Sequence, residues 1–586
     1  MKKIITAALS AVVAMTFTSC DHLLDSNRYP ETSIVNDPAF WSNANNCQQE
    51  CNRMYQYFYG YGSGSGYGNF YFNTLSDDQC GSTFAQWKFQ NVPTSSSTYN
   101  TAYTVIRGCN IIIENVNNSS LTDVQKRNFI GQARLMRGYE YANLVKYYGD
   151  VILVEGVLDL DSPELTAERT DRKTVADYAL ADFEYAAENI AAKNGIQVFS
   201  RDLAKAMLSE FCLTEGTFWK YCTLADNYYA PDAARSKKFL ELCVKYSDGL
   251  INDYPISSDY HALYNSTWSG DANAGVTSLS KNTEVIFATQ YEKDQFMHST
   301  IDYTCSSTTQ SGISKDAFDA YLFKDGLPKA KTKEDTNDVP VYMAEGVAGS
   351  DNGSGLSIEH MLAVRDQRLA ATIDPYVYYK GQTWARGGAM QSTSSTGYGI
   401  AKYDNPLLPE GYRDVAAKNY TSCPLYWGAV ICLNYAEAKA ELGTLTDADM
   451  NRTLNKLYAR AGLPSQTVAS LTAINDPANN MGVSSLLWEV RRCRRCELIM
   501  DNDFRYWDLV RWHQLELLDT NKHPNIMLGA AVPANAPIQP AVMSDGYINA
   551  SLGQARVYEA RQYVWPLPAD QMGNLNPNLK QNENWK

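Results

Sequence analysis

Residues 132–150 read Gln-Ala-Arg-Leu-Met-Arg-Gly-Tyr-Glu-Tyr-Ala-Asn-Leu-Val-Lys-Tyr-Tyr-Gly-Asp, and this stretch decides the fold class. Its apolar side chains recur every three or four residues, which places them on one face of an α-helix. They are Leu135, Met136, Tyr139, Ala142, Val145 and Tyr148. Gly149 follows, and glycine commonly ends helices. The stretch therefore predicts an amphipathic helix that ends at Gly149.

Three later stretches repeat this spacing. One apolar face covers residues 175–190, with Thr174 in position to cap the helix, and two more cover 203–218 and 239–250. Successive helices about thirty to forty residues apart are typical of a tetratricopeptide-like array of helical hairpins.

The remaining chain divides into helical and irregular parts. Residues 254–425 are rich in Ser, Thr, Gly and Asn and contain one clear strand-like piece, residues 285–288. Further helices are predicted at residues 38–57, 429–442, 450–461 and 484–518. We therefore expect a mainly α fold, in which a helical scaffold carries large irregular loop insertions. Such insertions are the usual place for binding specificity.

The first twenty residues have the features of an export signal. Met1-Lys2-Lys3 is basic, residues 4–16 are apolar, and Cys20 closes the segment. The apolar run is too short for a permanent membrane span. Its end resembles the lipobox of bacterial lipoproteins, where the cysteine is acylated. We therefore expect a signal peptide over residues 1–19 and a lipid on Cys20, with ordinary secretion as the alternative.

Charge and composition narrow the class of ligand. Removal of residues 1–19 leaves 567 of the 586 residues and changes the net charge from −14 to −16, because two lysines leave with the signal. Nucleic acid is therefore not expected as a partner, since it requires a basic face. The chain has 40 Tyr against 18 Phe. Tyrosine combines a flat apolar face with a polar tip, which suits a hydrated binding surface.

The sequence gives little support for catalysis, a metal or a cofactor. It contains neither G-x-S-x-G nor H-E-x-x-H, and its six histidines form no cluster. Cys493 and Cys496 have C-x-x-C spacing, but they lie in a helical pattern among arginines without a second ligand pair, so we expect helix-face cysteines rather than zinc ligands. We expect no catalytic residue, no metal and no cofactor.

The best candidate for ligand contact is the segment of residues 55–90, where tyrosines alternate with glycines. Sugar rings present apolar C–H faces edged by hydroxyls, so a sugar site combines aromatic planes with carboxylates or amides. We expect Tyr67 and Trp87 to supply planes and Asp77 and Asp78 to supply carboxylates. The alternative is a glycine-rich loop whose tyrosines pack on the scaffold.

Several ordered blocks resemble the SusD/RagB family of outer-membrane nutrient-binding lipoproteins. The strongest is Phe-Arg-Tyr-Trp-Asp-Leu-Val-Arg-Trp at residues 504–512, preceded by Glu497-Leu498. The others are residues 132–139 with 148–151, 321–326, 365–369, 433–439, 460–464, 565–568, 576–577 and 581–582. Two departures are visible: Gln367 stands where the family has Pro, and Asp501-Asn502-Asp503 stands where it has Glu-Gly. We interpret these blocks as helix packing and buried charge pairing, including an Asp508–Arg511 pair, rather than as a binding site.

The resemblance implies a SusD-like fold in one unit, residues 20–586. Its parts would be an N-terminal helical part to about residue 253, a loop-rich insertion over 254–425 and a C-terminal part over 426–586. It also implies glycan contacts from loops in the middle, and the candidates there are Trp268, Tyr291, Trp384 and Tyr398.

The same resemblance implies a function and a compartment. The protein would be lipid-anchored in the outer membrane, facing the cell exterior, and would bind an oligosaccharide or polysaccharide without catalysis. It would deliver the glycan to a SusC-like TonB-dependent outer-membrane transporter. Two alternatives remain: peptide capture by the same fold, and a lipoprotein glycoside hydrolase.

Overall fold

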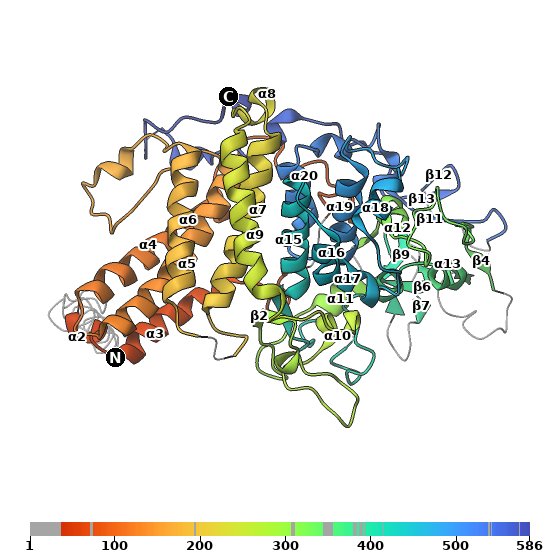
Figure 1. The fold of residues 1–586 in the computed structure, drawn as a ribbon, viewed down its shortest axis with the longest axis horizontal. Coiled ribbons are helices and arrows are strands. Elements are labelled where there is room, and N and C mark those ends of the chain that lie inside the picture. Colours follow the sequence, from red (N-terminus) through yellow and green to blue (C-terminus); the bar gives the residue numbers. More distant parts are fainter. Residues whose placement is uncertain are drawn as a thin grey trace, which may run out of the picture.

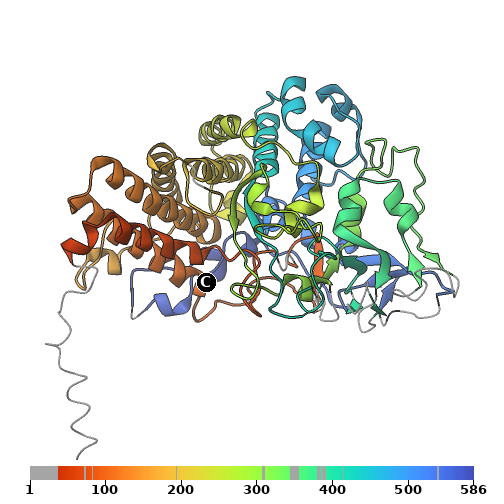
Figure 2. The ribbon, with the colours of Figure 1, turned by 90° about the horizontal axis from the view of Figure 1, so that it is seen from below.

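The computed structural model describes residues 37–70, 74–81, 83–192, 195–305, 311–343, 355–378, 384–385, 391–392, 394–413, 415–536, 540, 542–573 and 575–586. Long helices from the N-terminal part lie on one side of the molecule, and short sheets lie on the other (Figure 1). The helices that follow residue 427 lie between them, and the view from below in Figure 2 shows the same order. The predicted mainly α fold is confirmed.

The N-terminal part is built from helices that pack on their neighbours along the chain. Their bounds are α2 (Pro38–Trp41), α3 (Ala44–Asn52), α4 (Ser97–Asn118), α5 (Asp123–Tyr148), α6 (Arg172–Asn189), α7 (Arg201–Tyr221), α8 (Leu224–Asn227) and α9 (Ala233–Ile251). Contacts join α4 to α5, α5 to α6, α6 to α7 and α7 to α9. The single helix predicted at residues 38–57 is divided into α2, α3 and a 3-10 turn, η2 (Arg53–Tyr57). Among the described residues, no helix has both the length and the apolar character needed to cross a membrane.

Local signals explain where the long helices begin and end. Thr122 caps α5 through a capping box with Gln125, and Gly149, with φ of 75°, ends this helix as predicted. The predicted cap of α6 is wrong by three residues. Asp171 accepts the hydrogen bond from the Lys173 amide instead, so α6 starts one turn earlier than Thr174 would allow.

Glycine allows the paired helices to approach closely. A Cβ atom on Gly138 of α5 would lie 3.2 Å from the Ala179 oxygen of α6, and one on Gly216 of α7 would lie 2.7 Å from Leu240 of α9. Between α5 and α6, Arg137 donates to both carboxylate oxygens of Asp182, at 2.8 and 2.9 Å. The helical hairpins are thus joined by close backbone contact and by buried charge.

The irregular middle contains short antiparallel strand pairs and short helices. The strand predicted at residues 285–288 is β2 (Val285–Thr289), which pairs with β10 (Cys423–Trp427). The other strands are β1 (Gln79–Gly81), β3 (Ser311–Ile313), β4 (Val341–Tyr342), β5 (Leu356–Ser357), β6 (Ile373–Tyr378), β7 (Trp384–Ala385), β8 (Gln391–Ser392), β9 (Gly397–Ile400), β11 (Leu528–Ala531), β12 (Met543–Ser544) and β13 (Tyr547–Asn549). They form the pairs β1–β3 and β7–β8 and the sheets β4-β5-β6-β9 and β11-β13-β12. The short helices are α10 (Tyr260–Asn265), α11 (Thr300–Cys305), α12 (Lys315–Ala320), α13 (Glu359–Ala363) and α14 (Gln367–Thr372).

The helix predicted at residues 429–442 is present as α15, shifted by one residue, whereas the other two predicted C-terminal helices are divided. Their bounds are α15 (Gly428–Glu441), α16 (Asp447–Arg452), α17 (Leu454–Arg460), α18 (Val468–Ala473), α19 (Ser485–Glu497) and α20 (Phe504–Arg511). The predicted helix at residues 484–518 is interrupted between α19 and α20, where Met500, Asn502 and Asp503 have φ of 65°, 45° and 55°. A left-handed backbone cannot continue a right-handed α-helix, so a tight turn replaces the expected continuous helix.

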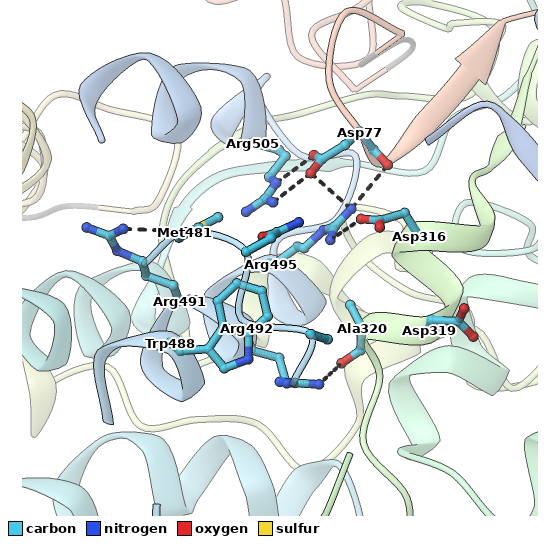
Figure 3. A pocket seen from close by; sticks show the side chains of 12 residues that line it. Asp77, Asp316, Asp319, Ala320, Met481, Trp488, Arg491, Arg492, Arg495 and Arg505 are labelled. Atoms are coloured by element: carbon cyan, nitrogen blue, oxygen red, sulfur yellow. Dashed lines mark hydrogen bonds and ion pairs between the residues drawn. The ribbon is translucent and has the colours of Figure 1, made fainter. Parts of the chain in front are cut away.

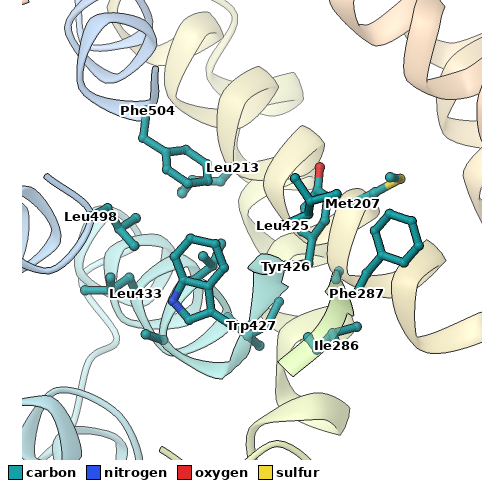
Figure 4. Close-up of a cluster of buried hydrophobic side chains, with 14 of the residues drawn as sticks. Met207, Leu213, Ile286, Phe287, Leu425, Tyr426, Trp427, Leu433, Leu498 and Phe504 are labelled. Atoms are coloured by element: carbon teal, nitrogen blue, oxygen red, sulfur yellow. The ribbon is translucent and has the colours of Figure 1, made fainter. Parts of the chain in front are cut away.

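One hydrophobic core runs through the helical and mixed parts. Residues from Trp41 to Leu579 belong to the same buried cluster. Figure 4 shows its centre, where α7, β2, β10, α15 and α20 meet around Trp427. The side chains labelled there include Met207, Ile286, Tyr426, Leu433 and Phe504. Because these elements share one core, the boundaries at residues 253 and 425 mark changes of pattern along the chain rather than separate cores.

Glu437 of α15 holds this junction together through buried charge. Its carboxylate accepts two hydrogen bonds from Arg511 of α20, at 2.6 and 2.7 Å, and one from Trp512 Nε1 at 2.6 Å. Arg511 also donates to Asp508 and to the hydroxyl of Thr217 in α7. The predicted Asp508–Arg511 pair is therefore present, within a larger network that joins three helices.

Replacement of Glu437 by Gln should destabilise the protein strongly. It leaves the buried guanidinium groups of Arg511 and Arg494 with only the Asp508 carboxylate between them, and loss of one charge from a buried network typically costs about 3–5 kcal/mol. We expect urea denaturation at pH 7 to show a loss of this size in the free energy of unfolding. The exposed Glu188→Gln on α6 is the matched control and should behave as wild type.

The difference in the free energy of unfolding between wild type and Glu437→Gln should depend on pH with a defined sign. Burial alone would raise the pKa of Glu437, but Arg511 and Arg494 hold it at about 2. The stabilisation by the Glu437 charge is thus complete above pH 4.5, the pKa of this group in the unfolded chain, and disappears as the pH falls through about 2. The gap between wild type and Glu437→Gln should narrow over that range, and an equal stability of the two proteins at pH 7 would contradict the structural role of the pair.

Candidate functional site

Two loops leave the same end of the β2–β10 strand pair. Thr289, the last residue of β2, lies opposite Cys423, the first residue of β10, because the strands are antiparallel. The loop that follows β2 and the loop that precedes β10 are then joined by hydrogen bonds between the backbones of His298 and Asn419, at 2.8 and 2.9 Å. The strand pair therefore brings residues 290–303 together with residues 409–413 and 415–422.

The glycine-rich residues 59–70 are fixed to the same place. Tyr291 Oη donates to the Gly62 oxygen at 2.5 Å, and Ser299 Oγ donates to the Gly64 oxygen at 2.7 Å. Ser299 Oγ also accepts from the Ala417 amide at 2.7 Å, so one hydroxyl contacts all three loops. A Cβ atom on Gly68 would lie 2.3 Å from the Gly60 oxygen, so this tight loop requires glycine there.

The three loops present a group of aromatic rings at the surface, which we call the aromatic surface. Tyr67 is 59% exposed and packs edge-on against Tyr303 at 5.1 Å between ring centroids. Phe296 is 40% exposed and stacks on the buried Tyr291 at 4.7 Å with an interplanar angle of 3°. The half-buried Tyr412 and Tyr420 complete it, edge to face at 5.6 Å.

Charged groups border these rings. Tyr412 Oη donates to the Asp294 carboxylate, at 3.0 Å from each oxygen, and Lys293 Nζ lies 4.3 Å from the centre of the Tyr412 ring. Tyr303 Oη donates to the Ser65 oxygen at 3.1 Å. The surface thus combines exposed aromatic faces with fixed polar groups, the combination that sugars require.

The predicted aromatic residues fall in different places. Tyr67 is exposed on the aromatic surface, so its contact with sugar stays a prediction, whereas Tyr291 lies beneath this surface and supports Phe296. Trp268 is half-buried against the main core, and its backbone oxygen accepts from the Ser278 hydroxyl. The prediction missed Phe296, Tyr303, Tyr412 and Tyr420. The signal available for Phe296 was its place in the charged sequence Glu-Lys-Asp-Gln-Phe, where an apolar residue has no helical or strand period.

The expectation that Asp77 and Asp78 contact sugar is corrected by their burial. Asp77 accepts two hydrogen bonds from Arg505, each at 2.7 Å, and Asp78 accepts one from Arg495 at 2.6 Å. Burial alone would raise the pKa of Asp77, but Arg495 and Arg505 hold it well below its usual range. Figure 3 shows Asp77 between these arginines, beside a cavity of about 80 Å³ in which Arg495 also pairs with Asp316. These carboxylates stabilise the fold and do not edge an exposed site.

Trp87 and Tyr398 are also structural. Trp87 is buried, and its Nε1 donates to the Val557 oxygen at 2.9 Å. Tyr398 is buried in β9 and stacks on Phe318 at 4.6 Å. Neither ring is available to a ligand that approaches from solvent, so both predictions are corrected for the same reason as Asp77.

Two predicted positions lie outside what the structure describes. Cys20 falls before the first described residue, and the side chain of Trp384 in β7 is not among those described.

Cys493 and Cys496 are buried on α19 as free thiols, in agreement with the helix-face interpretation. Within the described part of the chain, no cluster of three or more His, Cys, Asp or Glu side chains could hold a metal ion.

Comparison with solved structures shows a shared fold. A SusD-like carbohydrate-binding protein from Bacteroides fragilis is 20% identical, with 92% of this chain and 100% of that chain covered and a TM-score of 0.64. A SusD-like protein from the same organism is 19% identical, with coverage of 93% and 98% and a TM-score of 0.62. A SusD superfamily protein from Bacteroides vulgatus is 16% identical, with coverage of 93% and 100% and a TM-score of 0.59.

Comparison with protein families gives the assignment. No curated protein matches the chain. The family described as starch-binding and associating with the outer membrane matches residues 27–213. The SusD family matches residues 283–585, which is more than half of the sequence and includes the strongest block, residues 504–512. The chain therefore belongs to the SusD family.

Proposed function

We propose that the protein captures an oligosaccharide or polysaccharide on the aromatic surface without cleaving it. The observation that carries this proposal is the gathering of exposed and half-buried rings from three separate loops, of which Tyr67 and Phe296 are exposed. A folded chain normally buries such rings or scatters them, and a group of them with polar neighbours marks a binding surface. The likeness to a carbohydrate-binding protein from Bacteroides fragilis supports the same class of ligand.

Binding would be reversible stacking combined with hydrogen bonding. Apolar faces of sugar rings would lie on Tyr67, Phe296 and Tyr303, and sugar hydroxyls would bond to the phenol groups and to Asp294. Such contacts are individually weak, so a chain of several sugars would gain from contact with several rings at once. Nothing in this mechanism requires a bond to be broken.

We also propose that the protein acts at the outer membrane. Acylation of Cys20 would hold it there, and the match to a family described as associating with the outer membrane supports this location. A SusC-like TonB-dependent transporter would then receive the glycan from the aromatic surface, which would face the cell exterior. A capture protein gains from such an anchor because it stays close to its transporter.

The glycan proposal predicts that loss of exposed rings weakens binding. The double substitution Tyr67→Ala and Tyr303→Ala removes two stacking partners worth about 0.5–1.5 kcal/mol each, so the affinity should fall roughly tenfold. Affinity gel electrophoresis against a panel of polysaccharides would identify a ligand and measure the change in retardation.

The control for this experiment is Tyr342→Ala. Tyr342 is 43% exposed in β4. In Figure 1, β4 lies among the short sheets at the right edge, whereas α11, the helix that contains Tyr303, lies near the centre. This variant should keep wild-type retardation. Equal retardation of wild type and the double variant would remove the aromatic surface as the binding site, and shortened glycans in the incubation mixture would favour the hydrolase alternative.

The anchor proposal predicts a change of location. Cys20→Ser removes the thiol that would be acylated, so the protein should move from the membrane fraction to the soluble fraction. Cell fractionation with immunoblotting would show this, and mass spectrometry of the N-terminus would show the loss of acyl groups. A variant that remains with the membrane would contradict the lipid anchor.

A further inference from the structure

A second candidate site lies apart from the aromatic surface, between residues 57–69 and helices α4 and α5. It is a cleft of about 310 Å³, which we call the tyrosine cleft. Four tyrosines line it, together with amides and hydroxyls; the lining includes Tyr57, Tyr59, Tyr139, Tyr147, Asn69, Asn143, Ser97 and Thr98. Tyr59, Ser97 and Thr98 are exposed, so the cleft opens to solvent.

A single acid marks this cleft. Glu140 of α5 lines it and is only 8% exposed. Among the described residues, its carboxylate has neither a hydrogen bond nor an ion pair, and no Lys or Arg lines the cleft. A buried carboxylate normally has a cation or several donors as partners, because it loses the solvation of water. Glu140 therefore points to a partner that arrives with the ligand.

The neighbouring compartment shows how this part of the fold accommodates an ammonium group. It has a volume of about 200 Å³, shares Tyr147 with the tyrosine cleft and is also lined by Asp503 and Trp507. Lys146 Nζ lies 4.9 Å from the ring centres of both Tyr147 and Trp507, and its charge interacts with Asp503. An ammonium over aromatic faces beside a carboxylate is thus already present, supplied by the chain itself.

The tyrosine cleft offers the same kind of walls, but no Lys or Arg lines it, and Lys146 acts on Glu140 only from the neighbouring compartment. Aromatic faces carry negative electrostatic potential and favour cations, and the ionised form of Glu140 adds a negative charge. An anionic ligand would meet no basic group in the cleft, and a neutral sugar would leave the carboxylate without a counter-charge within the cleft. A protonated amine satisfies both the rings and Glu140.

We propose that the tyrosine cleft binds the protonated amine of a ligand, with Glu140 as its counter-charge and the tyrosine rings as its walls. We further propose that a sugar carries this amine, as in an unacetylated amino sugar. This last step rests on the glycan function proposed above, whereas recognition of the amine itself rests on the cleft alone. A lysine side chain of a peptide has the same chemistry, so the experiment must separate the two sources.

Titration calorimetry with three ligands makes this separation. The purified protein is titrated with a glucosamine oligosaccharide, with its fully N-acetylated counterpart and with a lysine-containing peptide amide. We expect the glucosamine oligosaccharide to bind at least tenfold more tightly than either of the others. Glu140→Gln should abolish that preference, and the exposed Glu188→Gln should retain it.

The possible outcomes have different meanings. If both oligosaccharides bind equally and Glu140→Gln changes nothing, the amine site is overturned while glycan binding on the aromatic surface stands. If the peptide binds through Glu140 and the oligosaccharides do not, the amine site stands and the sugar source is overturned. If none of the three ligands binds, the amine site is overturned, and the test of the aromatic surface remains separate.

Acidification provides an independent test of the role of Glu140. Burial raises the pKa of Glu140 to about 7, although Lys146 acts in the opposite direction. The other titratable groups that interact with Glu140 are Tyr57 of η2, Cys109 of α4, and Tyr139 and Tyr147 of α5, and burial raises the pKa of each of these. Between pH 7 and pH 5 these four groups stay neutral. Burial raises the pKa of Asp503, in the neighbouring compartment, to about 6, so Glu140 is isolated by comparison with Glu140→Gln, in which Asp503 titrates alike.

The advantage of wild type over Glu140→Gln in affinity for the glucosamine oligosaccharide should therefore shrink from about tenfold at pH 7 towards none at pH 5, because Glu140 gains a proton, whereas protonation of the ligand's own amine affects both proteins alike. An advantage that grows on acidification would contradict the proposal. Folding of the Glu140→Gln variant is checked in the same samples. Since the pKa of Glu140 is raised in the folded state, its charge destabilises the fold above about pH 7, and the variant should withstand more urea than wild type at pH 8.

Discussion

The buried carboxylate of Glu437 is the interaction on which the rest of the structure depends. It is fully buried, and it satisfies Arg511 and Trp512 at the junction of α15 and α20, while Arg511 extends the contact to Thr217 of α7. Buried charges are costly unless they are paired and hydrogen-bonded, so this network fixes the relative position of the three helices more narrowly than apolar packing alone would. It therefore fastens the N-terminal helices to the C-terminal part around the Trp427 core.

That junction also positions the candidate site. β10 leads directly into α15 and pairs with β2. The same core therefore positions the loops at the other end of this strand pair. Ser299 then links three loops by hydrogen bonds to Gly64 and Ala417. The aromatic surface is thus formed by loops that a rigid scaffold holds in place, which is a common arrangement for binding sites. The tyrosine cleft differs, because Glu140 and two of its tyrosines project from the regular helix α5.

Charge placement separates the structural acids of this protein from the acids proposed to contact ligand. Asp77, Asp78 and Glu437 are buried with arginine partners, and their removal would leave buried guanidinium groups with too few counter-charges. Glu140 is buried to a similar degree but has no such partner among the described residues, and Asp294 binds only a tyrosine hydroxyl at the surface. The presence of an acid near aromatic residues in the sequence was therefore a poor guide to ligand contact. The partner of each acid decided its role.

The sequence by itself determined the mainly α class, the end of α5 at Gly149 and the family, because helical period, a terminating glycine and the block at 504–512 are local features. It also indicated residues 55–90 as a segment of interest, and this segment contributes to both the aromatic surface and the tyrosine cleft. Only the tertiary structure decided which rings are exposed. Tyr61 and Tyr67 belong to the same glycine-rich stretch, yet Tyr61 is 1% exposed and Tyr67 is 59% exposed. The physical reason is that a loop has no period from which burial can be read. Tyr61 is buried because its hydroxyl bonds to the Tyr264 oxygen, which belongs to a segment about two hundred residues away along the chain.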